Sequence, residues 1–430
     1  MACLRTEGAT PRMRATTLLR SLLVLKHTRV KGFEFTDFGV EVDVAPTTRV
    51  PYCPQCMCKA RRVYDHRPRT WRHLDFAGME VTLRYAQRRV DCRRCGAIRA
   101  ELVPWADPGS RFTRDFEDQA AYFAQVVDRT TAAKTLRVAW RTIGQIVERV
   151  VARLGPVDRL ADLEHIGIDE LSYRRHHEYI STVVDHVAGR VVWAAEGKSA
   201  ATVDGFFKDL GPERAAKLQT VTMDMSGAFI EAVGRGAPQA KIVFDRFHVQ
   251  KMAQDAVDQV RREQVRLLAG SDDAAALKKA RWALLKNPWN LTAVETDKLS
   301  EVQRDNRPLY RAYLLKETLA EIFDRRQVNV AREKFLAWCR WAARSRLAPF
   351  KRLAKTIRRH LEGVLAFIAT GLTNGPIEGL NGKIRTITRR AYGFHSAKSL
   401  ISLIFLCCTG LVLRPVFKTP THPTARPVHA

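Results

Sequence analysis

The spacing of apolar positions divides the chain into a strand-rich beginning, a helical stretch, a mixed region and a long helical region. Alternating residues from Phe33 to Val44 predict one or two strands, and residues 69–90 read as strand, turn and strand. Residues 113–152 have apolar side chains at helical spacing, in three helices separated by short breaks. The last two helices have a helix-turn-helix layout, with the third beginning near Trp140-Arg141-Thr142.

The pattern changes after Gly155-Pro156. Three apolar strands come first, followed by a helix, a strand, a second helix and a last strand, which predicts a mixed α/β sheet. The strands are expected at 165–169, 179–185, 191–195, 219–224 and 240–245, and the first helix at 200–210. Residues 250–370 are almost wholly helical, and we expect the tryptophans there to be core residues: Trp282, Trp289, Trp338 and Trp341.

A further helix is predicted from Asn374, which is a good N-cap residue, with Pro376 in the first turn. Glu378 also lies in this turn, where unpaired backbone N–H groups favour an ionised carboxylate. Arg385 and Arg389 follow on the same face. An acid followed by a basic track suits a metal held beside a phosphate backbone, although an ordinary solvated helix with a capping acid has the same pattern.

The net charge says more about the protein's binding partner than its length does. The 430 residues contain 72 Lys and Arg against 45 Asp and Glu, a formal charge of +27. Such an excess favours a polyanionic partner, usually nucleic acid. The region between the first strands and the helices is especially rich in arginine, which indicates phosphate contacts.

Two C-x-x-C pairs stand out among the nine cysteines: Cys53 with Cys56, and Cys92 with Cys95. Two such turns separated by strands are the layout of a zinc ribbon, in which four thiolates complete a closed tetrahedral site. Ordinary thiols or a redox dithiol are the alternative. Cys58 is surplus, and His66 and His73 are competing ligand candidates.

Three acids stand at predicted strand ends: Asp169, Asp224 and Asp245. In open α/β sheets, functional groups collect at the carboxyl ends of strands. Asp169, Asp224 and Glu378 are candidate ligands of Mg²⁺ or Mn²⁺, because such ions prefer oxygen donors. Asp245 and His248 lie one helical turn apart, so they can orient a catalytic carboxylate or contact a nucleic-acid strand that is being cut. For each acid taken alone, helix capping is an equally good explanation.

Other features narrow the class of protein. No G-x-x-x-x-G-K-[ST] loop is present, which argues against ATP-driven chemistry. The apolar run from Leu400 to Leu413 is short for a bilayer and reads as a buried helix. No secretory signal is evident. We expect a cytoplasmic, nucleoid-associated protein with a disordered Pro-rich tail at 415–430.

Taken together, these sequence motifs resemble those of transposases of bacterial insertion sequences in the ISL3 family. The resemblance covers nearly the whole chain and rests on CPQC with DCRRCG, AAKTLRVAWRTIGQIVERVV, IGIDELSY, TVTMDMSGAF, IVFDRFHVQK and NGPIEGLNGKIR. It implies a zinc finger, a helix-turn-helix and a ribonuclease-H-like catalytic domain interrupted by an all-helical insertion. It also implies Asp169, Asp224 and Glu378 as the DDE metal ligands, and Asp245 and His248 as the D-x-x-H of related transposases.

The resemblance further implies binding of terminal inverted repeats, metal-dependent cleavage and strand transfer, by a homodimer or larger assembly on double-stranded DNA. A non-catalytic repressor derived from a transposase and a generic metal nuclease are the alternatives. The expected domains are an arm (1–30), the zinc ribbon (31–105), the helix-turn-helix (106–155), the catalytic domain (156–255 and 370–414) and the insertion (256–369). The DNA-contacting residues are expected to be Arg61, Arg62, Arg88, Arg89, Arg93, Arg94, Arg141, Lys383, Arg385, Arg389 and Arg390.

Overall fold

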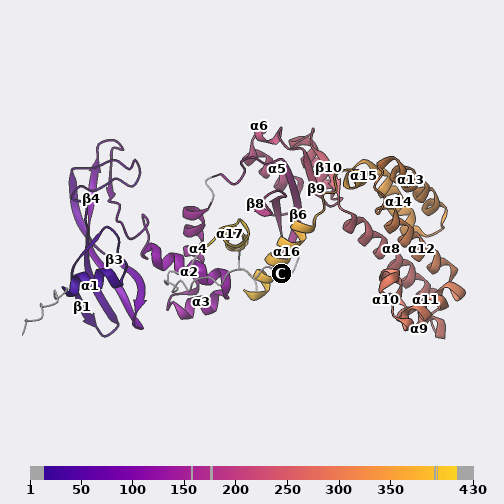
Figure 1. Cartoon of the computed structure of the whole chain (residues 1–430), viewed down its shortest axis with the longest axis horizontal. Helices are drawn as coiled ribbons and strands as arrows, with labels where there is room; N and C mark the ends of the chain where they lie inside the picture. Colours follow the sequence, from indigo (N-terminus) through magenta and orange to yellow (C-terminus); the bar gives the residue numbers. More distant parts are fainter. Residues whose placement is uncertain (1–13, 156–157, 175–177, 392–393, 395, 414–430) are drawn as a thin grey trace, which may run out of the picture. The chain divides into compact units, whose positions relative to one another are not determined.

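The computed structural model describes residues 14–155, 158–174, 178–391, 394 and 396–413, and Figure 1 colours them along the sequence. The chain divides into two compact units, Met1–Gly155 with Leu411–Ala430, and Pro156–Gly410. The predicted disordered tail and the first thirteen residues of the predicted arm lie outside the described residues. None of the helices that the structure describes is long and apolar enough to cross a membrane.

The first unit begins with a five-stranded sheet made of two antiparallel hairpins and a short fifth strand, β5, which pairs with β4. One hairpin pairs β1 with β2 and the other pairs β3 with β4, while β2 and β4 join them by running parallel. The bounds are α1 (Ala15–Leu22), β1 (Thr28–Thr36), β2 (Gly39–Pro46), β3 (Val63–Phe76), β4 (Met79–Cys92) and β5 (Ala97–Ala100). The alternating pattern from Phe33 to Val44 therefore forms two strands, as one of its two interpretations predicted, and the first of them begins earlier, at Thr28.

This sheet packs over a small apolar core that includes Val42, Trp71, Leu83 and Trp105. Three helices follow in the same unit: α2 (Arg114–Val126), α3 (Arg129–Thr135) and α4 (Trp140–Leu154). They match the three predicted helices. Buried side chains on α2 and α4, among them Phe116, Ile143 and Ile146, close the bundle.

The second unit is built on a mixed sheet with the strand order β10-β9-β6-β7-β8. β9 runs parallel to β6 and β10, whereas β7 is antiparallel to both of its neighbours. The bounds are β6 (His165–Arg174), β7 (Glu178–Asp185), β8 (Arg190–Glu196), β9 (Thr220–Met223) and β10 (Lys241–Phe244). This order and these directions confirm the predicted ribonuclease-H-like sheet.

One strand boundary was predicted wrongly. β6 was expected to end at Asp169, but it continues to Arg174 because its ladder with β7 extends to the Arg174–Glu178 pair. The ladder between β6 and β9 nevertheless stops at the Gly167–Thr222 pair. Asp169 is therefore inside a strand but beyond the parallel part of the sheet.

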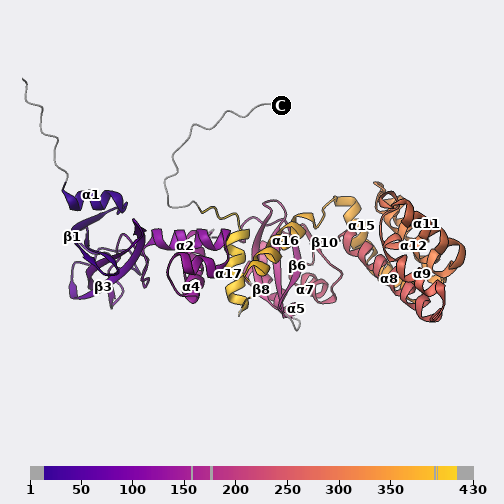
Figure 2. The same ribbon diagram turned by 90° about the horizontal axis from the view of Figure 1, so that it is seen from below.

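Helices cover both faces of this sheet. Ile166 and Ile168 of β6 belong to one apolar cluster with Phe206 of α5 (Ala200–Leu210) and Phe229 of α7 (Gly227–Gly236). On the other face, α16 (Gly375–Arg390) lies against β6, and α17 (Ala397–Cys408) packs against β8 (Figure 2). The short helix α6 (Pro212–Ala215) precedes β9. The apolar run around α17 is thus a packed helix, as predicted.

The chain between β10 and α16 is helical throughout its regular structure, as predicted. The bounds are α8 (Arg246–Leu267), α9 (Asp272–Lys279), α10 (Arg281–Leu285), η1 (Pro288–Asn290), α11 (Ala293–Asp305), α12 (Arg307–Ile322), α13 (Val328–Arg344), α14 (Ala348–Arg359) and α15 (Leu361–Thr370). The prediction that its tryptophans are core residues holds for Trp338, at 2% exposure. It was wrong for Trp282, Trp289 and Trp341, which are 60%, 77% and 38% exposed.

Candidate active site and zinc site

Three acids form a row across adjacent strands of the second sheet. Gly167 of β6 pairs with Thr222 of β9, and Phe244 of β10 pairs with Met223 of β9. Parallel strands keep a constant register, so extending both ladders by one or two residues brings Asp169, Asp224 and Asp245 to the same level. We call these three residues the acid row.

Gly167 brings helix α16 onto the sheet beside this row. A Cβ atom at Gly167 would lie 1.8 Å from Cδ1 of Ile377, a residue of α16 that is fully buried. Only glycine permits this approach. Alternate residues of a strand share a face, so Asp169 lies on the same face of β6 as Gly167 and points toward α16.

Two buried asparagines of this helix region contact the acid row. The side-chain amide of Asn381 donates a hydrogen bond to Asp169, and the backbone N–H of Asn374 donates one to Asp245. The amide of Asn374 also lies 3.4 Å from Nε2 of His248. Asn374 is the N-cap residue as predicted, but its side chain does not cap the helix, because it is used for this tertiary contact.

Asp245 and Asp224 differ in how their carboxylates are used. Asp245 is fully buried, and its two oxygens accept the backbone N–H groups of Phe247 and Asn374. One oxygen of Asp224 accepts the N–H of Ser226 at 2.9 Å, and the residue is half-buried. Asp245 thus caps α8 and holds α16, whereas Asp224 has an oxygen left for a ligand.

Glu378 is exposed on the first turn of α16, three residues before Asn381. Among the described residues, the four cysteines are the set of three or more candidate ligands whose donor atoms all lie within 4.8 Å of one another. Asp169, Asp224 and Glu378 are on neighbouring elements but are not gathered to that distance.

The electrostatics around Asp169 are those of crowded carboxylates. Burial and the charge of Asp224 raise the pKa of Asp169, although the N–H of Glu170, His248 and Asn381 favour its ionised form. Burial, with the charges of Asp224 and Asp169, raises the pKa of Glu170 to about 7. Partly desolvated oxygen donors of like charge fit a hard divalent cation, which would offset their repulsion.

The zinc ligands predicted from the sequence come together in the first unit. Cys53 and Cys56 lie on the turn before β3, Cys92 is the last residue of β4, and Cys95 lies on the turn that follows it. The sulfur atoms of Cys53 and Cys95 are 3.9 Å apart, and those of Cys56 and Cys92 are 3.5 Å apart. A tetrahedral site with Zn–S bonds of about 2.3 Å separates its sulfur atoms by about 3.8 Å. The cluster therefore has the size of a zinc site.

The acidity of these thiols also fits a metal. Burial opposes ionisation of Cys53, but backbone N–H groups of Cys56 and Gln55 lower its pKa to about 7. The N–H of Cys58 favours the Cys56 thiolate, yet burial and the neighbouring cysteines raise the pKa of Cys56 to about 12. Four thiolates this close need a cation between them.

The other ligand candidates have different roles. Cys58 accepts a hydrogen bond from Arg94 and is outside the cluster. His73 is buried, with its ring nitrogens 2.9 Å from Thr113 Oγ1 and 3.1 Å from the carbonyl of Leu23. His66 is exposed on β3. The turn after Cys95 has Gly96 at φ 62°, in the left-handed conformation that glycine adopts readily.

Helices α3 and α4 have the short connection that a helix-turn-helix requires. Asp128 caps α3, and Arg137 takes a left-handed conformation in the turn before α4. The guanidinium of Arg129 lies over the ring of Trp140 at 4.3 Å and braces the start of α4. Arg141, at the second position of α4, is exposed.

Some residues predicted to contact DNA have protein partners. Arg88 forms an ion pair with the buried Glu101 at 2.6 Å, Arg89 pairs with Asp65, and Arg94 is bonded to Cys58. Lys383 donates to a backbone carbonyl of α17. Arg62 forms an ion pair with Asp91 at 3.5 Å and stays exposed. The other exposed residues of the set are Arg61, Arg93, Arg141, Arg385 and Arg389.

Sequence reasoning did not find Gly167, Asn374 or Asn381 as parts of the site. A glycine between two isoleucines in a strand was the available signal for a close approach. Asn374 and Asn381 are seven residues apart, which places them on one face of α16. Nothing local to the sequence shows that this face meets the acid row.

Comparison with known proteins agrees with this architecture. Residues 166–404 match a family model described as a transposase, residues 49–95 match the zinc finger of transposases IS204/IS1001/IS1096/IS1165, and residues 101–151 match the helix-turn-helix domain of transposase family ISL3. The chain is 38% identical to the transposase for insertion sequence element IS1557 of Mycobacterium tuberculosis, over 93% of this chain and 96% of that protein. It is 30% identical to the transposase for insertion sequence element IS1001 of Bordetella parapertussis, over 85% of this chain and 91% of that protein. The chain therefore belongs to the ISL3 family of insertion-sequence transposases, enzymes that cut and join DNA.

Proposed function

We propose that this transposase works by the DDE mechanism, with Asp169, Asp224 and Glu378 holding divalent cations, Mg²⁺ or Mn²⁺. The observation that carries the proposal is the acid row beside α16. Asp169 and Asp224 each lie two residues beyond the last β6–β9 pair, Gly167–Thr222, and Asn381 ties the helix of Glu378 to Asp169. The crowding of these carboxylates supports a cation between them.

Asp224 is the better second ligand than Asp245, although the sequence left this choice open. Asp245 is fully buried and both of its oxygens are bonded to backbone N–H groups, whereas Asp224 is half-buried and only one of its oxygens is bonded to a backbone N–H group. We assign Asp245 and His248 to positioning. Asp245 fixes the start of α16. His248 lies beside the amide of Asn374 and interacts electrostatically with Asp169.

Glu378 is assigned by its place on α16. Asn374 and Asn381 reach the acid row from positions four residues before and three residues after Glu378, about one helical turn on each side. Its carboxylate is at the helix N-terminus, beside the unpaired backbone N–H groups of the first turn. Pro376 at the first turn and the buried Ile377 fix the turn that carries it.

The reaction is phosphodiester exchange. Divalent cations held by such acids activate the attacking oxygen and stabilise the departing one. The nucleophile is water in end cleavage and a DNA 3′-hydroxyl in strand transfer. The exposed Arg385 and Arg389 follow Glu378 on α16 by seven and eleven residues and would contact the phosphate backbone of the scissile strand.

The first unit would hold the DNA ends, with α4 in the major groove and one zinc ion on the four cysteines. In this proposal the protein acts on terminal inverted repeats of its element, at the nucleoid. Two ends must be joined in one reaction, so we propose at least a homodimer on DNA.

The test is cleavage of a labelled duplex carrying the flanking inverted repeats, with Mg²⁺, by variants Asp169→Asn, Asp224→Asn and Glu378→Gln. We expect each to bind the duplex but not to cut it. The control Asp255→Asn makes the same charge change at an exposed residue of α8 and should cut normally. Cutting by all three variants would refute the proposal. Binding without cutting by the natural protein, with Mg²⁺ and with Mn²⁺, would favour the repressor alternative.

A further inference from the structure

The sheet of the first unit contains a groove where its two hairpins separate. The β2–β4 ladder ends at the Asp43–Arg84 pair, whereas each hairpin continues on its own beyond that point. Twisted hairpins that are no longer bonded to each other diverge. The result is a hollow of about 900 Å³ lined by residues of β1, β2, β3 and β4, which we call the sheet groove.

Short side chains form much of the lining of the sheet groove. Gly32, Ala45, Pro68 and Ala86 come from its four strands, and none of them carries a long or charged group. Val44 and Tyr85 also line the groove, but Val44 is buried and the hydroxyl of Tyr85 is bonded to Glu101. The short side chains leave room for an extended polar chain to approach the strands.

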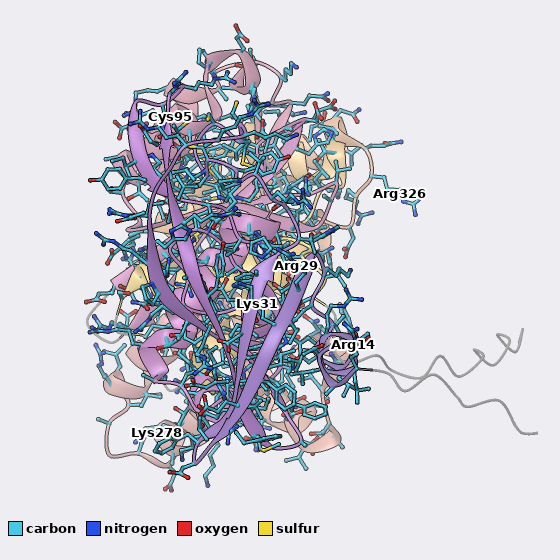
Figure 3. All side chains as sticks on the ribbon, turned by 90° about the vertical axis from the view of Figure 1, so that its left-hand side faces the viewer. Arg14, Arg29, Lys31, Cys95, Lys278 and Arg326 are labelled. Carbon is cyan, nitrogen blue, oxygen red and sulfur yellow. The ribbon has the colours of Figure 1, made fainter. Side chains whose placement is uncertain are left out.

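Cationic side chains line the sheet groove. Arg29 and Lys31 of β1 and Arg49 after β2 line the groove and are exposed. Within the part of the chain that the structure describes, no hydrogen bond or ion pair is formed by their side chains. Figure 3 shows Arg29 and Lys31 well away from Cys95 at the zinc end.

Other arginines of the groove have a different use. Arg84 is bonded to Asp43 at 3.0 Å and to Glu41 at 2.6 Å, and Arg88 is held by the buried Glu101. These ion pairs fix the walls of the groove. The three cations without such partners are therefore the groups available to a ligand.

We propose that the sheet groove holds the phosphate backbone of double-stranded DNA through Arg29, Lys31 and Arg49. This inference rests on the proposed function, because the DNA is that of the element's ends. Two of the cations come from β1 and the third from the segment after β2, and they line an elongated groove between strands, which suits a run of phosphates more than a single small anion. Phosphate contacts of this kind fix orientation without reading sequence, so recognition of the ends is left to α4.

The test compares two triple variants of the full zinc-loaded chain. The groove variant carries Arg29→Gln, Lys31→Gln and Arg49→Gln, and the control variant carries Lys59→Gln, Arg99→Gln and Arg111→Gln. The control residues are exposed, belong to the same unit and lie outside the groove, so both variants lose the same charge. Zinc content is measured for each, and the three single groove variants are prepared in case the triple variant does not fold.

Binding to a labelled duplex is measured by fluorescence anisotropy across a range of salt concentrations. Each phosphate contact contributes about 0.9 to the slope of log K against log[salt], so the groove variant should lose about 2.7 and each single variant about 0.9. The control variant should change little. The loss of affinity should be the same factor for the end sequence and for a scrambled duplex.

An equal loss in both triple variants would overturn the proposal, because net charge alone would then explain it. An unchanged slope in the groove variant would also overturn it and would leave an acidic protein as the alternative partner. Failure of the proposed function is seen separately, as absence of end cleavage by the natural protein, whatever the salt slopes are.

Discussion

Gly167 determines how closely α16 approaches the acid row, so Gly167→Ala is a direct perturbation of the site. The added Cβ would lie 1.8 Å from Ile377 Cδ1, 2.7 Å from Thr222 Oγ1 and 3.0 Å from His186 Nε2. Ordinary carbon contacts are about 3.5–4.0 Å. The end of Ile377 must therefore move by about 2 Å, and because the residue is fully buried we expect the helix to move with it.

The expected loss of cleavage rate comes mainly from the displacement of α16, and less from a loss of folding stability. Overpacking of this kind costs about 1–3 kcal/mol, which a domain of this size tolerates. A shift of about 1 Å in reacting groups lowers a rate by about a hundredfold. We expect Gly167→Ala to bind DNA ends as the natural protein does, because its DNA-binding helices are in the other unit, and to cleave them about a hundredfold more slowly.

The assay is single-turnover end cleavage, with hydrogen exchange of α16 as a second measurement. Gly234→Ala is the matched control, because a Cβ there meets no atom within 4 Å and alanine favours its helix. Adding Ile377→Ala to Gly167→Ala should restore part of the rate. If Gly167→Ala cleaves at the natural rate with unchanged exchange, the close approach does not set the geometry of the site.

Three further predictions concern single residues. Asn381→Ala should lower the cleavage rate by about 10–100-fold without weakening DNA binding, because it removes the hydrogen bond between α16 and Asp169. Equal losses in binding and cleavage would contradict a positioning role for Asn381. Cys92→Ser should lose the zinc ion and the fold of the first sheet, measured by elemental analysis and circular dichroism, since metal binding and folding are coupled in such sites. Burial lowers the pKa of His73 below its ordinary 6.5, so the unfolded chain binds the proton more readily. Stability of the first unit should therefore fall as the pH is lowered through about 6.5, and His73→Gln should reduce this dependence in thermal melts.

Local patterns predicted most of the regular structure. The helix at 200–210 has the observed bounds, and the two C-x-x-C pairs form one cluster. These features follow from residues close in sequence or from a fixed ligand geometry. Two acids at strand ends, Asp224 and Asp245, were also found, because an apolar run followed by Asp marks the edge of a sheet, whereas Asp169 lies inside β6.

The errors have tertiary causes. β6 was ended too early because its pairing with β7 continues past the acid, and a hairpin partner is not visible in the strand itself. Trp289 was placed in the core by composition, whereas it lies on a short exposed turn. Six arginines of the ribbon were predicted to contact DNA, and the sequence did not show that one of them, Arg88, pairs with a buried acid thirteen residues away.

Asn374 shows why local sequence propensities do not predict a site of this kind. By propensity it should cap α16 with its side chain, and the position is indeed the N-cap. Instead its side chain approaches His248 and its backbone N–H is bonded to Asp245, while its own side-chain oxygen is buried without a hydrogen-bond partner among the described residues. The helix therefore forgoes a local stabilising bond, worth about 1 kcal/mol, in exchange for attachment to the acid row. A residue that gives up its local role in this way indicates that the position of α16, and with it Glu378, matters more to this protein than the stability of the helix alone.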